Sequence, residues 1–151
     1  MKRKILIEDQ NGATVVEFAI ILPLLIVFLF GIIEFGLLLY NKQVITNASR
    51  EGARAGLVVR DPRLSNQEIK DKVKEYAQSR LVTFGSDTLE DDDIDILPID
   101  SGGGFDPNTE RCTSFGCDLK VGLTYYYDFL FLSNFGLGPI TLEEVSTMKM
   151  E

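Results

Sequence analysis

The chain has 151 residues, of which 45% are apolar and 25% charged, a composition that fits about one ordinary folded domain. It contains no histidine, which excludes the Ser-His-Asp and Cys-His mechanisms and the zinc sites that use imidazole. No glycine pattern matches a nucleotide-binding loop. The formal net charge of −8 argues against nucleic acid as a partner, because phosphates repel an acidic protein.

Charge and apolar residues are unevenly distributed along the chain. Residues 1–60 carry 7 Lys or Arg against 5 Asp or Glu, whereas residues 61–151 carry 8 against 18. Residues 18–33 form the uncharged run FAIILPLLIVFLFGII, which Glu34 and FGLLLY then follow. Residues 13–40 are predicted to form a transmembrane helix, since about 20 residues suffice to cross the hydrocarbon core. The preceding basic residues predict a cytoplasmic N-terminus and export of the acidic remainder.

Two simpler interpretations of this run compete, a secretory signal peptide and a plain signal anchor. The polar residues 8–12 separate the basic cluster from the apolar run, and the run is longer than the apolar core of a signal peptide. No A-x-A-like cleavage site follows before the helix continues. These features count against a signal peptide, and the plain anchor stays open.

The junction before the apolar run points to a specialised anchor. Glu17 lies five residues after Gly12 and is followed at once by Phe18. A carboxylate at the mouth of a membrane helix is costly, and such residues tend to be functional. Cleavage after Gly12 would give Glu17 a partner, because the new α-amino group at Ala13 would have a pKa of about 8 and be cationic at neutral pH.

The G-x-x-x-x-E-F arrangement from Gly12 to Phe18 resembles the processing site of type IV prepilins, which a membrane aspartyl prepilin peptidase cuts after the glycine. The longer string GATVVEFAIILPLLIVFLFGIIEFGLLLYNKQVITNASREGARAG, residues 12–56, resembles the TadE-type pseudopilins of the tight-adherence (Tad) pilus system. The resemblance implies that residues 1–12 are a leader removed between Gly12 and Ala13. It also implies a minor pilin-like subunit in which Glu17 and Phe18 serve assembly.

The resemblance further implies a location and a set of partners. The subunit would cross the inner membrane once, with its C-terminal domain in the periplasm or outside the cell, and it would in some form contribute to the pilus. Its partners would be the prepilin peptidase, other pilins and pseudopilins, the inner-membrane pilus assembly machinery and the lipid bilayer.

The long helix is expected to continue through residues 41–60, beyond the membrane. Pro23 lies within the span and is expected to kink the helix axis. Glu34 lies about 33 Å along the helix from Gly12, at the outer interface, so a carboxylate that reaches water and one with a paired or channel-facing role are both open. A stripe of residues four apart is expected to pack on the protein's own sheet in preference to another subunit: Tyr40, Val44, Ala48, Gly52 and Gly56.

Residues 61–151 are predicted to form an exported α+β domain. Asp61-Pro62 should end the long helix, and the capping box of Ser65 and Glu68 should open a second, amphipathic helix. Apolar alternation from Leu119 to Tyr127 predicts a strand, and residues 94–99 and 140–150 are further candidates for a small antiparallel sheet. The apolar face of the second helix would comprise Ile69, Val73, Tyr76, Ala77 and Leu81.

An acidic run is the best metal candidate in the chain, because calcium prefers several carboxylate oxygens and export supplies the ion. Its spacing is not that of an EF-hand loop, and adjacent carboxylates in a loop more often serve solubility. No cofactor is therefore expected, with calcium as the alternative. The run comprises Glu90, Asp91, Asp92 and Asp93, with Asp95 and Asp100 nearby.

Cys112 and Cys117 are the two cysteines, and both lie in the part expected to be exported. A disulfide is the default in an oxidising compartment and would contribute about 2 kcal/mol by the chain-entropy model. A thiol site is the alternative. Two thiols without histidine make a poor metal site, however, and the nearby cations that could activate a nucleophile are Arg111 and Lys120.

Three classes of function remain after these exclusions. A carboxylate pair such as Asp92 and Glu110 could in principle do acid–base chemistry, but neither spacing nor an apolar pocket signal singles out a catalytic group, so no enzyme is expected. An assembly subunit accounts for the leader, the isolated Glu17 and the long helix together. An exported binding module, such as an adhesin that uses the tyrosine-rich strand or the loop around Cys112, stays open.

Overall fold

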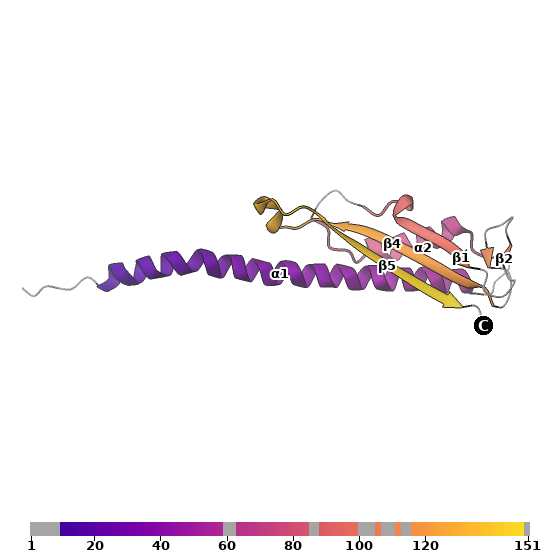
Figure 1. Ribbon diagram of the computed structural model, residues 1–151, viewed down its shortest axis with the longest axis horizontal. Coiled ribbons are helices and arrows are strands. Elements are labelled where there is room, and N and C mark those ends of the chain that lie inside the picture. Colours follow the sequence, from indigo (N-terminus) through magenta and orange to yellow (C-terminus); the bar gives the residue numbers. More distant parts are fainter. Residues whose placement is uncertain are drawn as a thin grey trace, which may run out of the picture.

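The computed structural model describes residues 10–58, 63–84, 88–99, 105–106, 111–112 and 116–149. One long helix, α1, carries an α+β domain along its C-terminal half (Figure 1), which confirms the predicted fold class. The remaining predicted features lie outside the described residues: positions 1–9 of the expected leader, the Asp61-Pro62 stop, Asp100 and Glu110.

Helix α1 spans Gln10–Leu57 and continues through Pro23. The helix has 48 residues and ends three residues before the predicted limit at residue 60. Helix-compatible residues run from Gly12 to the Gly/Ala-rich end, with Pro23 as the single proline. Among the described helices, α1 is the one long and apolar enough to cross a membrane. Its N-terminal half projects away from the domain as a bare rod (Figure 1).

Helix α2, Asn66–Gln78, begins at the predicted capping box. The Ser65 hydroxyl accepts a hydrogen bond from the Glu68 backbone N–H at 3.2 Å, and the Glu68 carboxylate accepts one from the Ser65 N–H at 2.7 Å. Three residues of the predicted apolar face are buried: Ile69, Val73 and Ala77. Tyr76 and Leu81 are partly buried and pack at the edge of the same core, with Leu81 beyond the helix end.

Three strands form an antiparallel sheet in the order β1-β4-β5. They span Ile94–Ile99 (β1), Asp118–Tyr127 (β4) and Ile140–Lys149 (β5). Tyr127 pairs with Ile140 at one end of the β4–β5 ladder, and Asp118 pairs with Lys149 at the other. A second, two-stranded sheet pairs β2, Phe105–Asp106, with β3, Arg111–Cys112. Two short 3-10 helices, η1 at Asp91–Asp93 and η2 at Leu132–Phe135, precede β1 and β5.

The alternation predicted for the central strand is confirmed, and it defines the core. One face of β4 is buried against the helices, through Leu119, Val121, Leu123, Tyr125 and Tyr127. The sheet, α1 and α2 therefore enclose a single apolar core, to which α1 contributes Ile45, Ala48 and Ala53.

The small-residue stripe of α1 packs on the protein's own domain, as predicted. A Cβ atom at Gly52 would lie 2.4 Å from a methyl group of Val73 in α2, and one at Gly56 would lie 2.4 Å from a methyl group of Leu119 in β4. These distances are too short for two carbon atoms, so glycine permits the close approach of α1 to both elements. Tyr40, the first residue of the predicted stripe, is instead half exposed.

Candidate functional site

The bare part of α1 comprises residues 12–29, all of whose side chains are exposed. At 1.5 Å per residue it is about 27 Å long, which is close to the thickness of about 30 Å of a bilayer's hydrocarbon core. The domain begins to cover α1 at Phe30, about ten residues before the predicted end of the transmembrane segment at Tyr40. The apolar run is longer than the part of α1 that the domain leaves uncovered, because an apolar side chain can face either lipid or a domain.

The predicted processing and pairing residues all lie on the bare part. Gly12 and Ala13 are within the first turns of α1, and Glu17 and Phe18 are exposed one turn further along. Glu17 has no hydrogen-bond or ion-pair partner among the described residues. Because the leader is attached, the nitrogen of Ala13 belongs to a peptide bond, and the pairing of Glu17 with a free amine stays a prediction.

Glu34 lies at the boundary between the bare part and the domain, and its side chain is only 2% exposed. Its carboxylate accepts hydrogen bonds from the backbone N–H groups of Leu130 and Phe131, the latter at 3.0 Å. Both donors belong to the β4–β5 loop, residues 128–139. The alternative in which Glu34 simply reaches water is therefore wrong, because the loop folds over this carboxylate.

Aromatic residues complete the contact around Glu34. The ring of Phe30 stacks on that of Phe131 with 4.5 Å between centroids and 12° between planes. Tyr127 is fully buried, and its hydroxyl makes no well-formed hydrogen bond among the described residues. Burial, and to a lesser extent the neighbouring Glu34 carboxylate, raise the pKa of Tyr127 to about 12. This Glu34 cluster joins the domain to the helix where the bare part ends.

Two more polar anchors on α1 were missed by the sequence analysis. The Asn41 side chain donates to the Val82 carbonyl at 2.7 Å and accepts from the Val82 N–H at 3.0 Å, so it clamps the chain after α2. The hydroxyl of Ser49 hydrogen-bonds that of Ser146 in β5 at 2.7 Å. Glu34 and Asn41 are seven residues apart and Ser49 is eight further on, which places all three on the covered face. This spacing of polar residues in a largely apolar helix is the sequence feature that could have indicated the three anchors.

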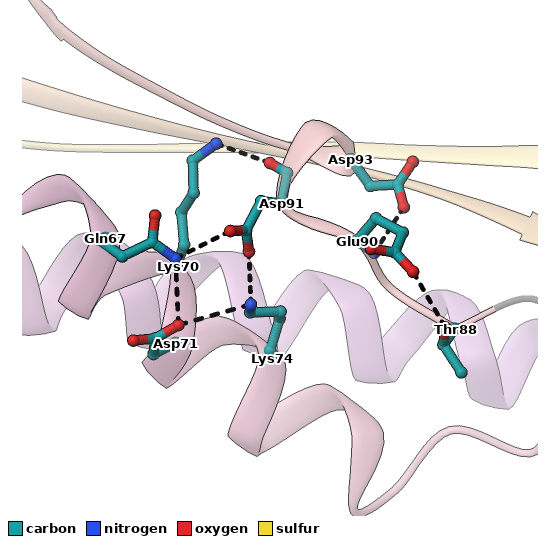
Figure 2. Close-up of polar contacts among 8 residues, drawn as sticks. All are labelled: Gln67, Lys70, Asp71, Lys74, Thr88, Glu90, Asp91 and Asp93. Carbon is teal, nitrogen blue, oxygen red and sulfur yellow. Dashed lines mark hydrogen bonds and ion pairs between the residues drawn. The ribbon is translucent and has the colours of Figure 1, made fainter.

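The acidic run packs against α2 (Figure 2). The Asp91 carboxylate pairs with Lys74 and accepts a hydrogen bond from Gln67 at 2.9 Å, while Lys70 donates to the Asp91 carbonyl at 2.6 Å. The Lys74 ammonium beside it, followed by Gln67, lowers the pKa of Asp91. The Asp93 carboxylate instead accepts from the Glu90 backbone N–H at 2.9 Å.

The described part of this run does not converge on one point. Asp92 and Asp95 take no part in the contacts of Asp91 and Asp93. Among the described residues no group of three or more carboxylates or thiols is placed to hold a metal ion. The run therefore connects α2 to the start of β1 through ion pairs and turn hydrogen bonds.

The predicted disulfide lies at the end of the domain far from the membrane helix. Cys117 is fully buried immediately before β4, and Cys112 lies on β3, paired with Phe105. The structure does not describe the side chain of Cys112. Among the described residues there is no free cysteine. The bond between Cys112 and Cys117 stays a prediction.

A surface hollow lies between α1 and α2. Its charged groups are engaged with one another: Lys72 pairs with Glu75 at 2.6 Å, and the Arg80 guanidinium lies 4.0 Å from the centre of the Tyr76 ring. Arg54 likewise lowers the pKa of Glu51 on the rim by a hydrogen bond. The hollow thus presents paired surface charges.

Comparison with known proteins bears on the helix. Residues 12–54 match the model of the family described as TadE-like protein. The matched segment begins at Gly12, covers the bare part, and continues through Glu34, Asn41 and Ser49, the three anchors of the domain. No curated protein and no solved structure matches the chain. The α1 segment is thus similar to that of TadE-like proteins.

Proposed function

We propose that this chain is a pseudopilin, or minor pilin, that is processed after Gly12 by a prepilin peptidase and acts in assembly of a Tad-type pilus used for adherence. Residues 13 to about 33 anchor it in the inner membrane, with the N-terminus in the cytoplasm and the α+β domain in the periplasm. The observation that carries the proposal is a TadE-like segment that begins at the expected cleavage residue and forms a helix bare over residues 12–29.

The bare part suits two environments. Eighteen residues of mostly large apolar side chains cannot stay in water without a large free-energy cost. Lipid covers them in the membrane, and a bundle of like helices covers them in a filament. Because lipid tails are about as apolar as leucine, transfer between the two environments changes the hydrophobic free energy little, and packing and polar contacts decide the outcome.

Glu17 is the polar contact that the bare part offers. In an apolar environment an unpaired carboxylate must be protonated or find a cation. Cleavage after Gly12 creates an amine four residues away, close to one helical turn, and a neighbouring subunit carries the same amine. Two subunits misaligned by a turn would leave charges unmatched in a low dielectric, so the pair sets the register of assembly.

Replacement of Glu17 tests this function. Glu17→Ala and Glu17→Gln should be cleaved after Gly12 as in the wild type, yet lose crosslinks to pilin partners in membranes and lose assembled pili. Glu17→Asp should lose part of both, because the shorter side chain reaches less well. Glu51→Ala is the matched control, since Glu51 is a carboxylate on the same helix but outside the membrane, paired with Arg54.

The two readouts separate processing from assembly. Normal crosslinks and normal piliation in processed Glu17→Ala would contradict an assembly role for this carboxylate. Loss of pili in Glu51→Ala to the same extent would also contradict it, because any carboxylate on α1 would then have the same effect.

A further inference from the structure

The β4–β5 loop is unusually apolar for a connection between two strands of an exported domain. From Phe129 to Leu142, FLFLSNFGLGPITL, fourteen residues carry no charge, in a domain that is otherwise rich in carboxylates. Three large side chains in and beside the loop stay about half exposed: Leu130, Leu137 and Ile140. An exposed group of large apolar side chains on an acidic domain indicates a contact surface.

The loop lies at the end of the domain that faces the bare part of α1. Its short helix η2 is the golden turn at that end in Figure 1. The Phe30–Phe131 stack fixes its height along the helix. Phe30 is about 26 Å from Ala13 along the helix axis, which is inside a hydrocarbon core of about 30 Å that starts at Ala13. A membrane that covers residues 13 to about 33 therefore reaches the loop.

Several backbone N–H groups of the loop have acceptors within the protein. Glu34 accepts the N–H groups of Leu130 and Phe131. Within the loop, the Asn134 N–H donates to the Phe131 carbonyl at 3.2 Å, and the Leu137 N–H donates to the Leu132 carbonyl at 3.4 Å. Gly136, with φ of +83°, closes this turn. Internal satisfaction of backbone donors is what an environment poor in water requires.

We propose that the β4–β5 loop is a second membrane contact, which inserts Leu130, Leu137 and Ile140 into the outer leaflet beside the point where α1 leaves the bilayer. The contact holds the domain at a fixed tilt and rotation about α1, so that every subunit presents the same face along the membrane. It rests on the membrane anchoring of α1 and not on the role in pilus assembly. Glu34 then has a defined task, to supply acceptors for backbone donors at the membrane surface.

Lipid is favoured over a second subunit as the occupant. The depth set by the Phe30–Phe131 stack brings the loop to the bilayer whenever α1 spans it, without any partner chain. After Asp128 at its start, the loop carries no charged side chain that could align a protein partner on it. A second subunit is an outcome that the experiment distinguishes.

Three single-tryptophan variants of the full chain test the contact, because the chain contains no tryptophan of its own. Leu137, Leu97 and Leu25 are matched leucines with exposed fractions of 50%, 53% and 51%. Leu137 lies in the loop, Leu97 on β1 pairs with Lys120 towards the far end of the domain, and Leu25 is in the bare part. Each variant is reconstituted at low density in phosphatidylcholine vesicles with brominated acyl chains, and its fluorescence is compared with that in unbrominated vesicles.

The proposal predicts a different depth for each reporter. Leu25→Trp should be quenched most by bromine near the middle of the bilayer. Leu137→Trp should be shifted to shorter emission wavelength and quenched most by bromine close to the headgroups. Leu97→Trp should keep the emission of a water-exposed indole and show no quenching. Both leaflets contain bromine, so the orientation of the reconstituted protein does not affect the comparison.

Other results would overturn the contact. Emission and quenching of Leu137→Trp equal to those of Leu97→Trp would show that the loop does not reach lipid. A blue shift of Leu137→Trp that appears only at high protein density, without quenching by bromine, would assign the loop to a second copy of the chain. Absence of quenching in Leu25→Trp would remove the anchor itself, and with it both this contact and the proposed function.

Discussion

Glu34 connects the membrane helix to the folded domain through a single side chain. Two backbone N–H groups of the β4–β5 loop donate to its buried carboxylate, and Tyr127 lies against it. Hydrogen bonds to a charged acceptor are stronger than those between neutral groups. The partners of Glu34 are 96 and 97 residues away, so the sequence around Glu34 could indicate an unusual carboxylate but not what binds it.

Removal of this carboxylate should weaken the domain. Glu34→Ala leaves two partly buried N–H groups without an acceptor, and we expect the free energy of unfolding to fall by about 2–4 kcal/mol. Glu34→Gln retains one acceptor oxygen, so its free energy of unfolding should fall by less. Denaturation of the full chain in detergent micelles, followed by near-ultraviolet circular dichroism of the tyrosines, measures both. Glu17→Ala is the control, and equal stability of Glu34→Ala and Glu17→Ala would contradict the anchoring role.

Tyr127 makes the same cluster sensitive to alkaline pH. Its pKa in the folded chain is about 12, above the ordinary value of 10.0, because burial and the Glu34 carboxylate disfavour the phenolate. Stability from the neutral hydroxyl is therefore fully present below about pH 10 and is lost as the pH rises through about 12. Ultraviolet titration of tyrosinate should show a late-ionising component that is smaller in Tyr127→Phe and shifted to lower pH in Glu34→Gln. An unchanged late component in Tyr127→Phe would contradict this assignment.

The helices and strands that depend on neighbouring residues were predicted correctly from the sequence. The capping box of Ser65 and Glu68 placed the start of α2, and the alternation from Leu119 to Tyr127 placed the buried face of β4. Both depend on residues within one turn or one strand of each other. The polar anchors Asn41 and Ser49 were missed because their partners come from distant parts of the chain.

The spacing of small residues on α1 predicted a packing stripe, and the structure shows which side chains pack against it. Gly52 faces Val73 of α2 and Val121 of β4, so the distance between α1 and both elements is set at this point. By contrast, Gly36 has no atom within 4 Å of where its Cβ would stand. The two glycines belong to one helix and differ only in what packs on them.

Alanine at these two positions should therefore have opposite effects. Alanine has a higher helix propensity than glycine by about 1 kcal/mol, which favours both variants. Gly52→Ala should nevertheless lower the free energy of unfolding by about 1–3 kcal/mol, because its methyl group overlaps Val73. Gly36→Ala should leave it unchanged or slightly raised. Chemical denaturation in micelles compares the two, and a Gly52→Ala domain as stable as Gly36→Ala would refute the close packing of α1 on α2.

The whole molecule is a rod whose two halves have different surroundings. The bare part of α1 is nearly as long as a bilayer core is thick, and the domain starts where that length ends. In the sequence, basic residues precede the apolar run and acidic residues follow it, an order of charge that favours a cytoplasmic N-terminus by the positive-inside rule. The sequence predicted this division, but placed its outer limit at Tyr40 because hydropathy does not separate lipid-facing from domain-facing residues.

The cysteines report on which side of the membrane the domain lies. In the periplasm Cys112 and Cys117 should be bonded, so that alkylation of the denatured protein without reductant labels neither. Reductant should make both reactive. In Cys112→Ser the remaining Cys117 should react only after denaturation, since it is fully buried in the folded domain. Quantitative labelling of both wild-type cysteines without reductant would contradict the disulfide and weaken the proposed orientation.

The intact mass of the protein extracted from membranes of cells that contain the prepilin peptidase tests the central claim most directly. A pseudopilin should have lost residues 1–12 and should begin at Ala13. Gly12→Val should retain the leader, because a side chain at this position keeps the backbone out of the peptidase site. Gly36→Ala, a glycine replacement elsewhere on the same helix, should be processed normally. A mature N-terminus other than Ala13, or an uncleaved wild-type chain in such cells, would contradict the account.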